Sequence, residues 1–179
     1  MQGPTSWRQL RFLVLGLVLA GLLALGLFWP FKTSGATVTL PASLPSVVGR
    51  GRVELPKIGS SVAQPVVVTF YASWCAPCEA EIPQIVRFVR AEKAKGVKVS
   101  FIGIDENDTE GGRAFTVKSG FDFPTGSDPD GDVLADLDAT PALPQTIFID
   151  TEGNIVHHVY GSVTADSVLE TWVKNLTSA

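Results

Sequence analysis

The sequence predicts an α/β fold, in which helices flank a central mixed β-sheet. Strand-like and helix-like segments alternate along the chain in the order β-α-β-α-β-β-α, which is typical of a sheet covered by helices on both faces. The first core strand, Val66–Tyr71, is an apolar run with one hydroxyl, as expected for a strand buried on both sides. The last two strands are joined by the turn at residues 151–154, a hairpin signal that makes the sheet mixed.

A long apolar segment lies near the start of the chain. Residues 12–29 are eighteen residues without a charge, which is at the threshold for a transmembrane helix and above the usual length of a signal-peptide core. Arg8 and Arg11 precede the segment and no acid occurs before Glu54, so we expect a cytoplasmic N-terminus. Residues 1–29 are therefore predicted to be a cytoplasmic stub and a single anchor. A cleaved signal peptide is the alternative, because residues 34–36 are small.

The remaining chain divides into a linker and one domain. Residues 30–52 are rich in Pro, Ser, Thr and Gly and are predicted to be a linker and N-terminal extension, with a short strand at 36–40. Residues 53–179 are long enough for one domain with its own core. Without the first thirty residues the chain holds 12 basic and 18 acidic residues, and this balance gives no reason to expect nucleic acid as a partner.

Within this domain the hydrophobic pattern predicts each element in turn. A helix over residues 76–95 has Ile82, Ile85 and Val89 at helical spacing, is interrupted and kinked at Pro83, and ends at Gly96. The other expected elements are an edge strand at 53–55, a strand at 97–105, a helix at 109–118, a turn and short helix from 128 to 137, strands at 146–150 and 155–160, and a last helix at 164–175.

Cys75 and Cys78 are the only cysteines, and they lie where the first core strand meets a helix. The helix N-terminus favours a thiolate at the first position, because unpaired backbone N–H groups and the macrodipole stabilise negative charge there. The second thiol lies one turn further in, close enough for a disulfide. We therefore predict a redox pair in which Cys75, the better-solvated thiol, is the nucleophile and Cys78 resolves the mixed disulfide. No cofactor beyond this disulfide is expected.

Other roles for the cysteines fit less well. A structural zinc site needs four ligands, and the chain adds only the adjacent His157 and His158. A c-type haem site requires His after the second cysteine, where Glu79 stands. A structural disulfide more often joins distant segments. We expect neither histidine to bind metal and at least one to be exposed, and we expect residues 105–108 to form a solvated loop.

Two motifs resemble those of a known family. Trp74, Cys75, Pro77, Cys78, Glu81 and Pro83 occupy the places of W-C-x-P-C-x-x-E-x-P, and a second motif over residues 143–153 begins with Leu143 and Pro144. The chain thus resembles, over roughly residues 53–175, the thioredoxin-like membrane-anchored thiol–disulfide oxidoreductases of bacteria, of the TlpA/ResA/CcmG type. The resemblance implies a thioredoxin-like fold in a single-pass protein of the bacterial cytoplasmic membrane, with its domain outside the cytoplasm. Its partners would be cysteine-containing exported proteins, such as apocytochrome c, and a membrane electron donor or acceptor.

The resemblance also assigns roles to residues around the cysteines. Glu81 lies one turn after Cys78, so it is either a proton partner of that thiol or a first-turn acid that suits the helix dipole; the resemblance favours the first. Pro144 is implied to be a cis-proline that presents the backbone of Leu143 to an extended substrate strand. Pro77 either fixes the backbone between the cysteines or is a good helix-start residue.

Trp74 is either part of the docking surface or ordinary packing. Two departures from related patterns accompany these assignments. Thr69 stands where thioredoxin itself has a buried Asp, which fits an exported branch of the fold better than a cytosolic one. Residues 140–143 are richer in proline than the usual pattern and change the expected shape of the substrate groove.

The leading hypothesis is therefore an enzyme, an extracytoplasmic thiol–disulfide oxidoreductase that acts as a reductase or an oxidase. The alternative is a thioredoxin-fold copper metallochaperone for a terminal oxidase, a class whose cysteines are spaced by three residues and joined by a distant histidine. A peroxidase would need Thr or Ser three residues before its reactive cysteine, and Ala72 occupies that place.

Overall fold

A computed structural model describes residues 37–59, 63–106, 110–163 and 166–178. The compact unit spans Gly35–Ala179. The predicted anchor and the alternative cleavage site fall within residues 1–36, outside the described part of the chain. In the part that is described, no helix has both the length and the apolar character needed to cross a membrane.

A five-stranded mixed sheet forms the centre of the unit, in the strand order β5-β4-β3-β6-β7. The central strand β3 (Val66–Tyr71) pairs in parallel with β4 (Ser100–Asp105), and β4 pairs in parallel with β5 (Thr125–Ser127). On the other side, β6 (Gln145–Ile149) and β7 (Ile155–Tyr160) form the antiparallel hairpin that the sequence predicts. All six residues of β3 are buried, because helices and loops cover both faces of the sheet.

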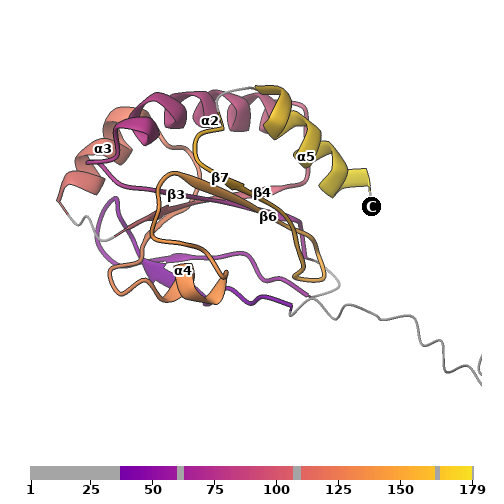
Figure 1. Ribbon diagram of the computed structural model, residues 1–179, viewed down its shortest axis with the longest axis horizontal. Coiled ribbons are helices and arrows are strands. Elements are labelled where there is room, and N and C mark those ends of the chain that lie inside the picture. The colour runs from indigo at the N-terminus through magenta and orange to yellow at the C-terminus, as the bar shows by residue number, and fades with distance from the viewer. Residues whose placement is uncertain (1–36, 60–62, 107–109, 164–165, 179) are drawn as a thin grey trace, which may run out of the picture. The chain divides into compact units, whose positions relative to one another are not determined.

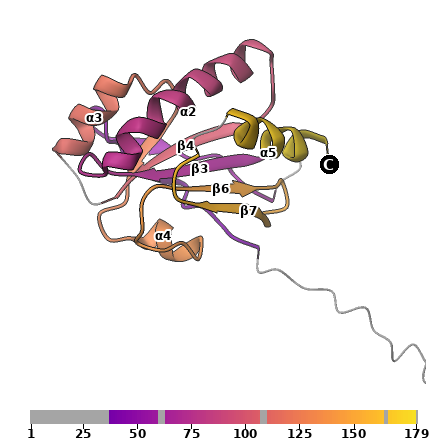
Figure 2. The ribbon, with the colours of Figure 1, turned by 45° about the horizontal axis from the view of Figure 1, so that its top comes forward.

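Helices cover both faces of the sheet, as predicted (Figures 1 and 2). The helices α2 (Ala76–Ala94), α3 (Gly111–Ser119) and α5 (Asp166–Ser178) lie on one face, and the short α4 (Asp132–Asp136) lies on the other. The α4 face also carries a small hairpin of β1 (Ser43–Pro45) and β2 (Arg52–Glu54).

The alternation of side chains along the strands produces two apolar cores. One core, on the α2 face, includes Phe148, Ile82 and Leu169 together with both cysteines. The other, on the α4 face, includes Phe70, Ile147 and Val133. The cysteine pair is therefore attached to a fully packed layer, which holds it in one place relative to the sheet.

Of the three short strands that the structure describes, the sequence analysis predicted only β2, as a strand at 53–55, and it missed β1 and β5. The strand expected at residues 36–40 is wrong, since residues 37–40 are not in a strand and β1 lies at Ser43–Pro45. Strand β5, with the sequence Thr-Gly-Ser, has no apolar periodicity to detect. Gly126 in β5 is packed under Leu44, so that a Cβ at this glycine would lie 2.7 Å from the leucine side chain. Strand β4 begins at Ser100 and not at residue 97.

Helix α2 runs unbroken through Pro83, so the predicted interruption is wrong. Proline removes the hydrogen bond to the carbonyl four residues earlier, which here belongs to the exposed Glu79. Water can satisfy that carbonyl. The neighbouring Ile82 and Ile85 are buried in the core and hold the helix on the sheet across this position.

Candidate functional site

The cysteines lie at the turn between β3 and α2. Cys75 is the N-cap of α2 and has an extended backbone, so its sulfur lies beside the first free N–H groups of the helix. The Cys75 Sγ accepts a hydrogen bond from the Cys78 backbone N–H at 3.2 Å. The exposed Pro77 lies in the first turn of α2, where the absence of an N–H costs nothing and the fixed φ suits the helix.

The two thiols form a disulfide, with an S–S distance of 1.98 Å and a Cα–Cα distance of 5.2 Å. Cys75 is 4% exposed and Cys78 is fully buried. The first cysteine is thus the more accessible of the two, as predicted, but it is less solvated than its position before the helix suggests. Its sulfur turns inward to bond with Cys78 and to accept the N–H bond, which withdraws it from water.

Glu81 lies one turn after Cys78 on the buried face of α2. Its side chain is fully buried, and neither carboxylate oxygen has a partner at hydrogen-bond geometry among the described residues. Burial raises the pKa of Glu81 from 4.5 to about 7, and the nearby Val163 N–H and Ser162 hydroxyl lower it only in part. Glu81 is therefore a buried group that exchanges a proton near neutral pH.

The helix-dipole role that the sequence leaves open for Glu81 belongs to Glu79. Glu79 is the exposed acid of the first helical turn, and it pairs with Lys118 at 3.1 Å. Glu79 and Glu81 are only two residues apart, but one is exposed and the other is buried because they lie on different faces of α2.

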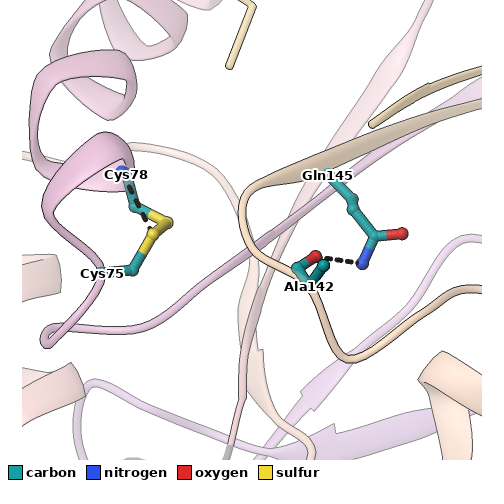
Figure 3. The surroundings of a disulfide bond; sticks show 4 residues. All are labelled: Cys75, Cys78, Ala142 and Gln145. Carbon is teal, nitrogen blue, oxygen red and sulfur yellow. Dashed lines mark hydrogen bonds between the residues drawn. A yellow bond between two sulfur atoms is a disulfide. The ribbon is translucent and has the colours of Figure 1, made fainter. Parts of the chain in front are cut away.

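The segment before β6 faces the disulfide. The Leu143–Pro144 peptide bond is cis, and the Pro144 carbonyl accepts a hydrogen bond from the Gly161 N–H at 3.0 Å. The partly buried Leu143 packs against the apolar cluster that contains both cysteines. Figure 3 shows the backbone between Ala142 and Gln145 bending toward the disulfide. Leu143 and Pro144, which connect these two residues, therefore belong to the bend that is turned toward the redox pair.

Trp74 and Thr69 occupy contrasting surroundings. The Trp74 side chain, immediately before the redox pair, is 67% exposed, so it is not ordinary packing. A large exposed aromatic ring at the rim of a site is the kind of group that contributes most to docking. Thr69 is buried in β3, and its hydroxyl has no hydrogen-bond partner within the described part of the chain.

Acidic residues at the end of β4 were not identified from the sequence as part of the site. The solvated loop predicted for residues 105–108 is wrong for its first half: Asp105 is fully buried and Glu106 partly so, while residues 107 and 108 are not among those described. Burial, with a smaller contribution from the charge of Asp128, raises the pKa of Glu106 to about 7. The Glu106 N–H donates to the Tyr71 carbonyl at 2.9 Å, which brings this acid next to the turn that carries the cysteines.

A signal for this placement existed in the sequence. Carboxyl ends of parallel strands meet at one edge of a sheet, and Tyr71 pairs with Asp105 in the observed register. An acid directly after β4 is therefore expected to lie near the cysteines, which follow β3.

The two histidines are half-buried, and the expectation that one would be exposed is wrong. The His157 ring stacks on Trp172 and the His158 ring on Tyr160, each with ring centroids 3.8 Å apart. Burial lowers the pKa of both rings. Among the described residues, no three His, Cys, Asp or Glu side chains form a group with metal-ligand geometry.

Fold and site together define the class. Three features are typical of a thioredoxin-like protein. They are the mixed sheet ordered β5-β4-β3-β6-β7, the Cys-x-x-Cys disulfide at the start of α2, and the cis-proline in the segment that faces it. The chain belongs to the AhpC/TSA family, whose model matches residues 38–158.

Curated proteins and solved structures similar to this chain include the following three. It is 30% identical over 112 residues to the thiol-disulfide oxidoreductase ResA of Bacillus thuringiensis, a match covering 63% of each protein and thus less than two thirds of ResA. It is 31% identical over 156 residues to the thiol:disulfide interchange protein DsbE homolog of Paracoccus denitrificans, covering 78% of this chain and 81% of that protein. The structure of MTB DsbF matches with a TM-score of 0.63 and 26% identity, over 78% of this chain and all of that one.

Proposed function

We propose that this protein is an extracytoplasmic thiol–disulfide oxidoreductase that exchanges the Cys75–Cys78 disulfide with cysteines of exported proteins. One observation carries the proposal: the disulfide lies at a helix N-terminus, a cis-proline segment bends toward it, and a buried carboxyl group follows one turn along the same helix. The names of the relatives, ResA and the DsbE homolog, support it.

The exchange proceeds in two displacements. In the reductase direction the Cys75 thiolate attacks one sulfur of a substrate disulfide, and the other substrate sulfur leaves with the electron pair as a thiolate. The Cys78 thiolate then attacks Cys75 Sγ, which forms the protein disulfide and releases the second substrate thiolate. The protein is oxidised by two electrons and the substrate is reduced by two. The oxidase direction is the same sequence reversed.

Glu81 serves the second displacement. Cys78 is fully buried and must lose a proton before it can attack, and Glu81 lies one turn away in the same dry layer. Because the pKa of Glu81 is about 7, the carboxylate accepts that proton at neutral pH and returns it in the reverse direction. A carboxyl group with its ordinary pKa would be a weaker base for a thiol.

Location and partners belong to the same proposal. Arg8 and Arg11 followed by the apolar segment 12–29 support a single anchor in the bacterial cytoplasmic membrane with the domain outside. The motif resemblance supports apocytochrome c as one substrate and a membrane protein as the electron donor or acceptor.

The test is an exchange assay with the full-length chain. The reduced protein is mixed with a disulfide-containing protein such as insulin, and its two thiols should disappear as substrate thiols form. Equilibration with glutathione then gives the reduction potential. A value near about −270 mV favours a reductase and one near about −120 mV an oxidase. Absence of exchange in both directions would refute the proposed function.

A further inference from the structure

One buried amide holds the segment that faces the disulfide. Gln145 follows the cis-proline directly, and its side chain is fully buried although it is polar. Its Nε2 group donates to the Thr140 carbonyl. The same group donates to the Ala142 carbonyl at 2.5 Å, as Figure 3 shows. Its Oε1 accepts from the Thr140 N–H at 3.2 Å. The amide thus reaches back to the main chain three and five residues earlier.

These contacts replace the ordinary bonds of the loop. The main chain of residues 140–143 makes no backbone–backbone hydrogen bond to any described residue. Pro141 and Pro144 have no N–H to donate. Thr140, Pro141 and Ala142 are exposed, so packing does not hold them either. Leu143 packs against both apolar cores, and for the exposed residues 140–142 the Gln145 side chain is the hydrogen-bonded connection to the sheet.

Strand β7 also contacts the Gln145 amide. The His158 Nε2 lies 3.0 Å from Gln145 Oε1, and the His158 ring stacks on Tyr160 of the same strand. An amide oxygen only accepts, so the His158 nitrogen is the donor in this contact. The Gln145 amide is thereby fixed in orientation, since its NH₂ group must then point toward the loop carbonyls.

We propose that Gln145 is a positioning residue for substrate docking, in that it holds residues 140–143 so that the Leu143 backbone is preset to pair with an extended, cysteine-containing peptide strand. The inference rests on the proposed exchange function. A loop that is already ordered avoids the entropy cost of ordering it when the peptide binds. Gln145 does not touch the sulfurs in this account, so it should affect docking and not the intrinsic reactivity of Cys75.

The test compares two mixed-disulfide substrates that share the same leaving group and differ only in whether the cysteine belongs to a peptide. The first is a short extended peptide whose single cysteine is joined to thionitrobenzoate, and the second is the same disulfide on N-acetylcysteine amide. A Cys78→Ser background stops the reaction after Cys75 takes the peptide or cysteine sulfur and the coloured thionitrobenzoate leaves with the electron pair. The ratio of the two second-order rate constants measures peptide docking alone.

Gln145→Met has nearly the same size but makes none of these hydrogen bonds. We expect it to lower the peptide rate constant by about tenfold and to leave the N-acetylcysteine rate constant unchanged. His158→Leu, at a half-buried position, should cause a smaller fall in the same direction. Ile149→Val, which removes a methylene group at the far end of the same strand, is the control and should keep the parental ratio.

The outcomes separate the two proposals. An unchanged ratio in both Gln145→Met and His158→Leu, or an equal fall in both rate constants, would overturn the positioning role. A fall in Ile149→Val as large as in Gln145→Met would overturn it too, because loss of stability would then be the cause. If the Cys78→Ser parent reacts with neither disulfide, the exchange function itself fails, and the inference that depends on it fails as well.

Discussion

Replacing Glu81 with Gln should make the stability of the protein depend less on pH. In the folded protein the pKa of Glu81 is about 7, against 4.5 for the unperturbed group. The folded state therefore holds its proton more tightly than the unfolded state. The contribution of protonated Glu81 to the free energy of unfolding is complete below pH 4.5. It is lost as the pH rises through about 7, because the folded protein must then carry a buried charge.

The size of the effect follows from the same two values. Each pKa unit corresponds to about 1.4 kcal/mol, so ionising Glu81 above pH 7 costs the folded state about 3 kcal/mol. The glutamine side chain of the variant carries no charge at any pH. The Glu81→Gln protein should therefore gain up to about 3 kcal/mol over wild type at pH 8 relative to their difference at pH 4. This is far from the few tenths of a kcal/mol expected for a surface position.

The assay is urea unfolding of the oxidised full-length protein at pH 4, 6 and 8. Glu106, whose pKa is also raised to about 7, is present in both proteins and cancels in the difference. Glu79→Gln, which changes the exposed acid on the same helix, is the matched control and should follow wild type within about 0.5 kcal/mol. A wild-type-minus-variant difference that stays constant from pH 4 to pH 8 would show that the Glu81 pKa is ordinary.

Three further predictions test the remaining conclusions. Cys78→Ser should accumulate mixed disulfides at Cys75, whereas Cys75→Ser should form none at normal rates; trapping on a non-reducing gel distinguishes them. Protease added to intact spheroplasts should digest the domain if residues 12–29 are an anchor, and full protection or recovery of a soluble mature form would contradict it. Gly126→Ala should lower the unfolding free energy by about 1–3 kcal/mol, since its Cβ would lie 2.7 Å from Leu44; an unchanged urea midpoint would mean that the hairpin shifts freely.

The sequence by itself predicted the sheet, its flanking helices and the redox pair. Val66–Tyr71 is long and continuously apolar, and a six-residue strand with that pattern has few other places to fold than the centre of a sheet. The Cys-x-x-Cys spacing sets a local geometry at the helix start, and local geometry does not depend on the rest of the chain. The cis state of Pro144 came from the motif resemblance, and the structure confirms it.

Tertiary structure alone decided how each polar group near the cysteines behaves. Glu79 and Glu81 are the same residue type two positions apart, and only the packing of α2 on the sheet makes one exposed and the other fully buried. The strand order could have placed Glu106 near the cysteines, but only burial in the folded domain raises its pKa, and Gln145 reaches the loop from a strand-end position that no periodicity reveals. A pKa or a hydrogen-bond partner depends on desolvation and on segments far apart in the chain, and these exist only once the sheet has formed.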